Sequence, residues 1–359
     1  MSKKVVKSES LNGLYLCGKL RDLSKKLLYV SIILYICTMK ELFKGKKVLY
    51  VHGFASSGQS GTVSRIREVL AQSSVVAPDL PIHPEEALNL LYKVCASEKP
   101  DLIIGTSMGG MYAEMLRGYD RILVNPALKM GDTMREHGMI GTQHFQNPRQ
   151  DGVQDFMVTK ALVKEYKDIA ERCFDGIDDE ERQHVWGLFG DEDTMVNTYD
   201  LFREHYTQAV RFHGEHRMND NSFMHSVVPV IRWISDKQEG RERPIVYIST
   251  RALIDQYGKP LSSSQKAVRL LLENYQLYFV APATVDARHY ADVNAWLYEY
   301  INVPAYGHTI FTNQPNLLYG DYLIDTQMVD GMATLIEFGT DTFRTWDDVI
   351  PYFERLGGQ

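Results

Sequence analysis

The chain has 359 residues, of which 44% are hydrophobic and 24% charged, so it is long enough for two globular domains with substantial cores. Its formal net charge of −7 leaves no basic surplus to neutralise phosphates, which argues against a nucleic-acid-binding protein. The cysteines have no paired spacing and support neither a disulfide framework nor a zinc site; they are Cys17, Cys37, Cys95 and Cys173. We therefore expect reduced thiols, a cytoplasmic protein, and no metal or other cofactor.

Residues 1–38 do not have the pattern of a folded domain. Two lysines precede the apolar run 27–38, which is shorter than the roughly 20 residues that span a bilayer. No small-residue cleavage site of a signal peptide follows it. We interpret residues 1–38 as an upstream extension or a tail, with Met39 as the natural start, and an interfacial anchor is the less favoured alternative. Membrane contact is not expected.

From Lys46 onward, short apolar runs alternate with helical patterns, which is typical of a parallel sheet covered by helices on both faces. The expected strands are 47–52, 75–78, 102–105, 121–124, 185–189 and 209–212. The expected helices are 63–71, 84–97, 111–118, 158–173, 198–206 and 223–234. Residues 39–237 thus predict one α/β domain, with its ligand site at the carboxyl ends of the strands. Residues 129–182 form a long connection, either a lid over an acyl pocket or a plain helical insertion.

A Gly-x-Ser-x-Gly sequence, from Gly105 to Gly109, follows the third expected strand and precedes a helix. This context is typical of a nucleophile elbow, a strand-to-helix turn that holds a serine in a strained backbone conformation. Glycines are expected two residues on either side of the serine because a Cβ fits badly where strand and helix pack closely. Ser107 is therefore the candidate nucleophile, and an inert serine in a tight turn is the alternative.

The segment His52-Gly-Phe54 ends the first strand, where the chain must turn back over the nucleophile. The backbone N–H groups of Phe54 and Met108 would together make a two-donor oxyanion hole. An ordinary glycine turn is the alternative. We expect His52 to hold this loop rather than to move protons.

The acid and the histidine of a triad are expected after the last two strands of this domain, in the chain order serine, acid, histidine. The turn after the fifth strand supplies Asp193, with Asp191 in reserve, and a solvated acidic turn is the alternative. After the sixth strand, His216 lies in a turn where a triad base belongs. His225, on the last helix, is the reserve base. His213, which is expected to point into packing, is the least favoured candidate.

Taken together, these motifs resemble the YqiA/YcfP group of small α/β-hydrolase esterases. The resemblance covers residues 46–237 and rests on His52–Ser57, Asp79–Pro81, Gly105–Gly110, Val124–Ala127 and Gly214–His216. It implies Ser107 as nucleophile, His216 as base and an acid in the turn 190–193. It also implies that the substrate is an acyl ester or thioester.

A charged, glycine-containing segment, 237–243, marks the expected domain boundary. Beyond it, residues 243–359 predict a second, smaller α/β domain without an elbow. Its expected strands are 245–249, 277–280, 309–312, 322–324 and 334–338, and its expected helices are 263–274 and 290–301.

This second part resembles the haloacid-dehalogenase fold, especially its deoxyribonucleotidase-like members, through residues 245–251, 320–325 and 343–348. The resemblance implies an Asp-x-Asp pair on the first strand, but Ser249 and Arg251 occupy these positions. Only Asp321 and Asp325 remain of the metal-binding acids. An arginine in place of an aspartate puts a cation where Mg²⁺ would be held. We interpret this domain as catalytically degenerate, retained for packing, dimerisation or ligand binding.

The sequence therefore predicts a serine esterase or thioesterase. Ser107 would attack an acyl carbonyl while His216 removes its proton and Asp193 orients the imidazole. The alternative is a non-catalytic ligand-binding or scaffold protein built from two vestigial enzyme folds. The expected partner is a small acyl ester or thioester, and a homo-oligomer stays open.

Overall fold

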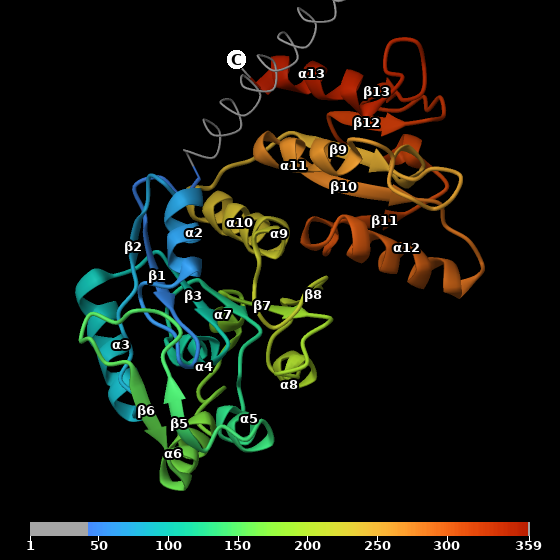
Figure 1. Ribbon diagram of the computed structural model, residues 1–359. Coiled ribbons are helices and arrows are strands. Elements are labelled where there is room, and N and C mark those ends of the chain that lie inside the picture. Colours follow the sequence, from blue (N-terminus) through green and yellow to red (C-terminus); the bar gives the residue numbers. More distant parts are fainter. Residues whose placement is uncertain (1–41, 358–359) are drawn as a thin grey trace, which may run out of the picture.

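The computed structural model describes residues 42–357, so the predicted extension 1–38 and the predicted start at Met39 lie outside the described part of the chain. Two parallel sheets follow one another along the sequence, six-stranded and then five-stranded, and helices flank both of them (Figure 1). The predicted fold class, an α/β protein with two successive parallel sheets, is confirmed.

The first sheet has the strand order β2-β1-β3-β4-β7-β8, and every neighbouring pair in it is parallel. Its strands are β1 (Lys47–Val51), β2 (Ser74–Val76), β3 (Leu102–Thr106), β4 (Arg121–Val124), β7 (Val185–Gly190) and β8 (Ala209–Phe212). This order, with the candidate elbow directly after β3, is that of an α/β-hydrolase. All six strands overlap the predicted ones.

Each face of this sheet has its own hydrophobic core, because successive side chains of a strand point to opposite faces. Leu102 and Ile104 of β3 pack with helices α2 (Gly61–Val69) and α10 (Val228–Glu239). Ile103, between them, belongs to the core of the other face. Its helices are α3 (Pro84–Glu98), α4 (Met108–Met115), α6 (Lys160–Ala170) and α8 (Tyr199–Arg203).

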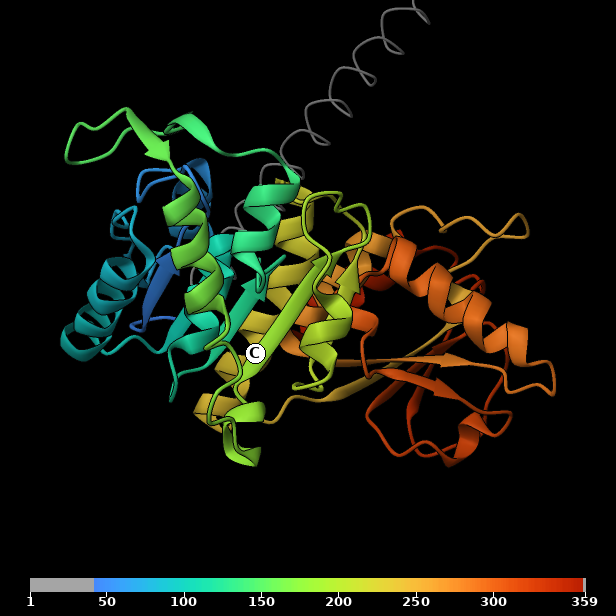
Figure 2. The same cartoon turned by 90° about the horizontal axis from the view of Figure 1, so that it is seen from below.

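The connection between β4 and β7 has more structure than the sequence predicted. It contains α5 (Met130–Glu136), an antiparallel hairpin of β5 (Gly141–His144) and β6 (Asp155–Val158), α6, and α7 (Asp179–Arg182). Figure 2 shows the hairpin projecting beyond the main sheet. Its strands have four residues each, and most of those side chains are exposed or half-buried. Their sequences therefore lack the alternation of apolar and polar residues that predicts a strand.

The second sheet has the order β11-β10-β9-β12-β13 and is also entirely parallel. Its strands are β9 (Ile245–Ser249), β10 (Gln276–Ala281), β11 (Thr309–Phe311), β12 (Tyr322–Asp325) and β13 (Thr334–Glu337). Its helices are α11 (Ser264–Asn274), α12 (Ala287–Tyr300) and α13 (Trp346–Gly357). Helix α13 was not predicted. The fully buried Trp346 anchors it by donating a hydrogen bond from Nε1 to the Ala252 carbonyl at 2.7 Å.

The helix that precedes the second sheet differs from the predicted 223–234 at both ends. It begins with the short helix α9 (Asp220–Ser222), which continues into a π-turn, Phe223–Val227. Pro229, just after this turn, has no N–H to donate to the carbonyl of His225. The helix ends only at Glu239, where Gly240 adopts a left-handed conformation with φ of 60°. The predicted charged link 237–243 is therefore partly helical.

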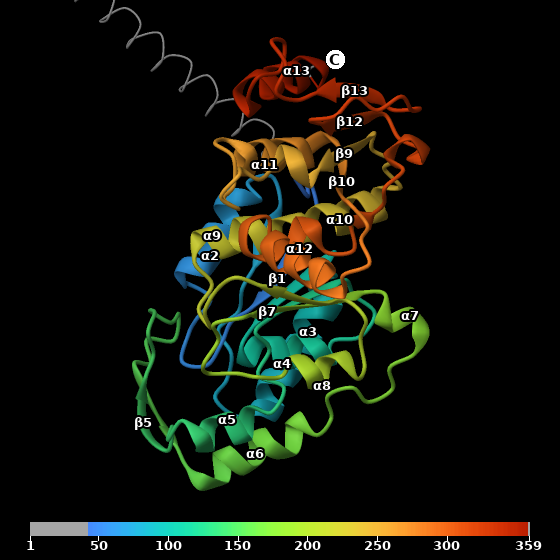
Figure 3. The same ribbon diagram turned by 90° about the vertical axis from the view of Figure 1, so that its right-hand side faces the viewer.

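The two sheets are joined through helices that lie between them, as Figure 3 shows for α10 and α12. Trp233 of α10 stacks on His308 with 5.2 Å between ring centroids. Tyr306 donates a hydrogen bond from Oη to the Thr207 carbonyl, just before β8, at 2.9 Å. Helix α12 also contacts β8, so the second part of the chain covers an edge strand of the first sheet.

Two further observations concern the cysteines and the lengths of the helices. Cys95 and Cys173 are buried free thiols, whereas Cys17 and Cys37 lie outside the described residues. Between Leu42 and Gly357, none of the helices is long and apolar enough to cross a membrane.

Candidate active site

Ser107 lies in the turn between β3 and α4 with φ of 54° and ψ of −121°. This conformation is sterically strained for a residue with a Cβ and is maintained by the surrounding packing. A Cβ on Gly105 would lie 2.4 Å from the Gly109 carbonyl oxygen, and one on Gly109 would lie 2.0 Å from the Val51 carbonyl oxygen. Both glycines are therefore required by the close approach of strand and helix, which is the geometry of a nucleophile elbow.

Three of the predicted site residues meet at the carboxyl edge of the sheet. His216 Nε2 lies 3.0 Å from Ser107 Oγ, and His216 Nδ1 lies 2.7 Å from Asp193 Oδ2. The side chain of Asp193 is 3% exposed and that of His216 is 20% exposed. Ser107 follows β3, Asp193 follows β7 and His216 follows β8, so parallel neighbours in the sheet converge on one point.

The surroundings of Asp193 determine how its carboxylate can act. Its Oδ1 atom accepts hydrogen bonds from the backbone N–H groups of Met195 at 2.7 Å and Val196 at 2.9 Å. These bonds stabilise the negative charge and leave Oδ2 to face His216. An ionised carboxylate can only accept a hydrogen bond, so this contact favours the His216 tautomer that donates from Nδ1 and leaves Nε2 as an acceptor facing the Ser107 hydroxyl.

The other acid and histidine candidates do not lie in the chain of contacts that joins Ser107, His216 and Asp193. Asp191 accepts a hydrogen bond from the Gly214 N–H at 3.1 Å and lies 3.5 Å from His213, so it shapes the loop after β8. The side chain of His213 is half exposed, and its predicted inward orientation is wrong. His225 lies in the π-turn before α10 and is not among the residues that line the cleft beside Ser107.

His225 should nonetheless make the stability of the fold depend on pH. Burial, with a smaller contribution from the charge of Arg269, lowers the pKa of His225 to about 4. An imidazole in an unfolded chain titrates near 6.5, so between these values the unfolded state binds a proton that the folded state does not. We expect this residue to reduce the free energy of unfolding by up to about 3 kcal/mol as the pH falls from about 6.5 towards 4.

Urea unfolding of the parent and of His225→Gln at pH 7 and pH 5 measures this effect. The parent should lose more stability than the variant over this interval. An equal loss in both proteins would show that His225 does not titrate as its surroundings indicate.

The predicted oxyanion donors flank the nucleophile. Met108 is the first residue of α4, and a Cβ on Gly53 would lie 3.3 Å from the Cβ of Ser107, so the loop carrying Phe54 passes directly beside the serine. Within residues 42–357, neither the Phe54 N–H nor the Met108 N–H has an acceptor. Both groups are available to an oxyanion, and their role stays a prediction.

His52 has the position predicted for it. Its Nδ1 atom lies 2.8 Å from the Gly53 carbonyl oxygen, and its Nε2 atom accepts a hydrogen bond from the Leu80 N–H at 3.1 Å. Burial lowers the pKa of His52, which favours the neutral ring that this pair of contacts requires. His52 therefore connects the loops after β1 and β2 beneath the site.

Asn125 is a residue whose role sequence reasoning missed. It lies directly after β4, is 2% exposed and has φ of 45°. Its Oδ1 atom accepts the Gly190 N–H at 2.7 Å, and its Nδ2 group donates to the carbonyls of Glu215 and His216, both at 3.0 Å. Asn125 thus ties the turn of the acid to the turn of the histidine. The available signal was a polar residue following a fully apolar strand at the ligand edge of the sheet.

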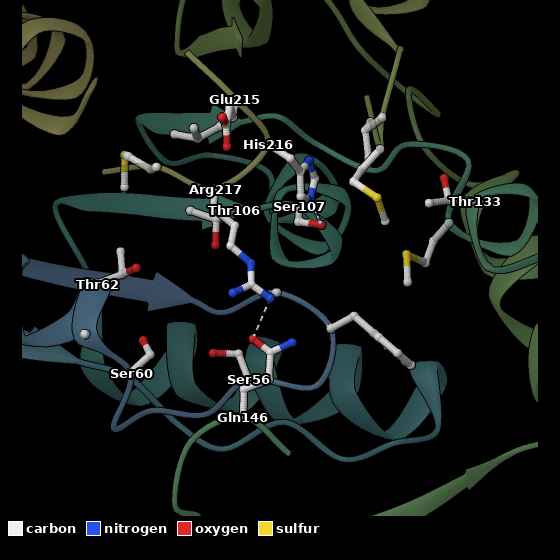
Figure 4. A pocket seen from close by; sticks show the side chains of 18 of the residues that line it. Ser56, Ser60, Thr62, Thr106, Ser107, Thr133, Gln146, Glu215, His216 and Arg217 are labelled. Carbon is white, nitrogen blue, oxygen red and sulfur yellow. Dashed lines mark hydrogen bonds between the residues drawn. The ribbon is translucent and has the colours of Figure 1, made fainter. Parts of the chain in front are cut away.

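The converging residues open into a cleft of about 1560 Å³. In Figure 4, Thr133 lies on one side of Ser107, whereas Thr62 and Ser60 lie on the other. The apolar lining comes from Phe54, Val124, Met130, Met139, Met195, Val196 and Met218. Met218 also lies beside Gly61 and Thr62, at the start of α2. The hydroxyl, amide and guanidinium groups of the polar side come from Tyr50, Ser56, Ser60, Thr62, Thr106, Gln146, Asn147 and Arg217.

The connection between β4 and β7 covers part of this cleft, as a lid would. Met130, Met139, Gln146 and other residues of the connection line it. The loop between β5 and β6 is also tied to the loop after β1, because the Gln146 N–H donates to the Ala55 carbonyl at 2.8 Å and Ser57 Oγ donates to the Pro148 carbonyl at 2.7 Å. These contacts favour the lid interpretation over a plain insertion.

The second sheet arranges its acids differently from what the sequence suggested. Arg251 forms a two-pronged ion pair with Asp325, whose side chain is fully buried, with 2.8 Å between Nη2 and Oδ2. Asp321 lies before β12, at the opposite edge, where its Oδ2 accepts the Ile245 N–H at 2.8 Å. The two acids are therefore not brought together. Over the described range, no cluster of three or more His, Cys, Asp or Glu side chains could hold a metal ion.

Comparison with protein families identifies the family to which the region of the first sheet belongs. Residues 47–234, more than half of the chain, match the model of "Uncharacterised protein family (UPF0227)". The chain belongs to this family. The UPF0227 region contains Ser107, Asp193 and His216, and it ends within α10, before the second sheet begins.

Beyond the UPF0227 match, the relatives are more distant. A curated protein of Vibrio phage KVP40, described as "Putative 5'(3')-deoxyribonucleotidase", is 28% identical over 127 residues, which is 33% of this chain and 70% of that protein. The solved structure titled "Marine microorganism esterase" is 18% identical, with 55% of this chain and 95% of that chain covered and a TM-score of 0.34. For "Est1E from Butyrivibrio proteoclasticus" the identity is 18%, the coverages are 55% and 88%, and the TM-score is 0.36. These likenesses are too distant to carry an argument about activity.

Proposed function

We propose that the UPF0227 region is a serine hydrolase that cleaves carboxylic esters or thioesters through an acyl-enzyme intermediate. The observation that supports this proposal best is the continuous set of contacts from Asp193 through His216 to Ser107, with the serine in a strained turn. A strained serine within hydrogen-bond distance of a histidine that an acid orients is the arrangement that activates a hydroxyl nucleophile.

In the proposed reaction, Ser107 Oγ attacks the acyl carbon while His216 Nε2 takes its proton. Asp193 stabilises the imidazolium that forms, and the N–H groups of Phe54 and Met108 donate to the oxyanion. His216 then returns the proton to the departing alcohol or thiol. Water, deprotonated by the same imidazole, attacks the acyl-enzyme and releases the acid and the free serine.

The cleft supports an acyl substrate with an apolar chain. Methionine side chains from the lid and from the turn after β7 line it, at Met130, Met139 and Met195. Methionine is flexible and fills irregular space, so this lining could adapt to chains of different length. The lid would also reduce the access of bulk water to the reacting carbonyl.

Hydrolysis of p-nitrophenyl esters of increasing acyl length, with EDTA present throughout, tests the proposal. We expect activity that EDTA does not reduce, a rate that rises with chain length until the apolar side is filled, and covalent labelling by a fluorophosphonate. If no ester is cleaved and no label is incorporated, the alternative of a non-catalytic ligand-binding or scaffold protein is preferred.

We also propose that the chain divides near Gly240, and that the part from Ile245 onward is a haloacid-dehalogenase-like domain without phosphatase chemistry. The ion pair between Arg251 and Asp325 supports this, because a guanidinium occupies the carboxylate that would otherwise be available to Mg²⁺. Mg²⁺-dependent release of phosphate from p-nitrophenyl phosphate would contradict the proposal.

A further inference from the structure

The polar side of the cleft contains the amino end of helix α2. This helix has nine residues, no acidic side chain in its first turn and no side-chain hydrogen bond at its N-cap. Among the described residues, the N–H groups of Gly61, Thr62 and Val63 have no acceptor, and Gly61 and Thr62 line the cleft. The free N–H groups and the dipole at the start of a helix favour a negative charge.

Ser60, the N-cap residue of α2, provides an independent sign that a ligand belongs here. The residue is 5% exposed, it lines the cleft, and its Oγ makes no hydrogen bond of normal distance and angle within residues 42–357. Close to it lies the Tyr50 hydroxyl, whose pKa burial raises and the hydroxyls of Thr106, Thr62 and Ser60 lower. The neighbouring hydroxyls of Tyr50 and Thr106 bond to one another at 2.8 Å. A buried hydroxyl without a partner is unfavourable, and a bound group with an acceptor oxygen would satisfy it.

Arg217 supplies a positive charge to the same part of the cleft. Figure 4 shows its guanidinium projecting between Ser107 and the group formed by Ser56, Ser60 and Gln146. Its Nη2 donates to Gln146 Oε1 at 3.0 Å, and in the described part of the chain it meets no carboxylate within ion-pair distance. Two acidic residues, Glu192 and Glu215, also line the cleft. Arg217 directly follows His216, so the turn that positions the candidate base positions this cation as well.

We propose that Arg217, Ser60 and the amino end of α2 form a subsite for an anionic group, a phosphate or a carboxylate, on the leaving-group part of the ester. This inference rests on the hydrolase function proposed above. The leaving group is assigned to this subsite because the lid helix α5, which contributes Met130 to the cleft, lies on the other side of Ser107, where Figure 4 shows Thr133. We place the acyl chain on that side. The preferred substrate is then an acidic ester with an apolar acyl chain, rather than a neutral lipid.

Matched butyrate esters test the subsite: 4-(butyryloxy)phenyl phosphate, 4-(butyryloxy)benzoate and the neutral 4-methoxyphenyl butyrate. The readout is the ratio of kcat/KM for each anionic ester to kcat/KM for the neutral one. Because charge-assisted hydrogen bonds are strong, Arg217→Gln should lower this ratio at least about tenfold. Differences in the intrinsic reactivity of the esters cancel when parent and variant are compared.

Two further variants control the experiment. Thr62→Asp places a carboxylate at the start of α2, where a helix tolerates it, and should lower the same ratio by repelling the anion. Arg344→Gln removes an exposed arginine that pairs with Asp341 beyond the second sheet, and should leave the ratio unchanged. The arm in which the ratio falls further, phosphate or carboxylate, identifies the anion.

An unchanged ratio in Arg217→Gln and Thr62→Asp would overturn the subsite and leave the hydrolase standing. If no ester is hydrolysed, the proposed function has failed, and the subsite is tested by measuring anion binding instead. The affinities of the parent and of Arg217→Gln for phenyl phosphate and for benzoate are then measured by calorimetric titration. Binding of either anion that weakens at least about tenfold in the variant supports the subsite, and no binding, or equal binding to both proteins, overturns it.

Discussion

Replacing Ser107 with alanine should reduce kcat for the ester series by at least about 10³-fold, close to the level that binding and the oxyanion donors alone sustain. The reason is that Ser107 Oγ is the nucleophile within reach of His216 Nε2, at 3.0 Å. Alanine leaves the shape of the cleft intact but has no atom to form the acyl-enzyme. The variant should also fail to take up a fluorophosphonate.

The Ser107→Ala variant should remain folded, because serine and alanine both carry a Cβ in the strained conformation of the turn. Its thermal unfolding should therefore stay close to that of the parent. Ser97→Ala, on the exposed face of α3, is the matched control and should retain full activity. Activity in Ser107→Ala equal to that of the parent would show that the serine in the elbow is inert.

The variant Asp193→Asn should reduce kcat by about 10³- to 10⁴-fold, the size of effect that loss of the correct tautomer has in other triads. The asparagine oxygen can still accept the N–H groups of Met195 and Val196, so the turn should persist. Its amide would then donate to Nδ1 of His216. The ring would carry its proton on Nε2 and could not accept the proton of Ser107.

Asp191→Asn is a sharp control for this prediction, because it makes the same chemical change two residues away. Asp191 accepts a hydrogen bond from the Gly214 N–H and does not contact His216 in the structure. We expect a loss of kcat below about tenfold, reflecting the single backbone hydrogen bond involved. A larger loss in Asp191→Asn than in Asp193→Asn would reverse the assignment of the acid.

The first sheet could be predicted closely because its strands are short apolar runs bounded by glycines and polar residues. The elbow could also be predicted, since the strain at Ser107 and the close packing at Gly105 and Gly109 are local consequences of one pentapeptide. Elements without a strong local pattern were missed, as the β5–β6 hairpin shows. So was α13, whose anchor Trp346 bonds to the distant Ala252 carbonyl.

The acidic residues of the second sheet also show which features the sequence reveals and which require the structure. The sequence showed that Arg251 replaces an expected aspartate and that Asp321 and Asp325 remain. Only the fold shows that Arg251 pairs with Asp325, while Asp321 lies at the other edge of the sheet and caps the start of β9. Positions along a strand can be counted in a sequence, but the edge at which a flanking residue lies depends on where the strand begins and ends.

By itself, the sequence determined the fold class, the order of the strands along the chain and the residue types available at the carboxyl edge of the first sheet. Tertiary structure decided which of them meet: Asp193 rather than Asp191 faces His216, and Asn125 binds both of their turns. It also decided that Arg217 and the start of α2 line the same cleft. The physical reason is the distance along the chain between the residues that interact. Strand and turn patterns arise from near neighbours in the sequence. The contacts of the site join distant residues, which only the pairing of β4, β7 and β8 and the folding of the loops bring together.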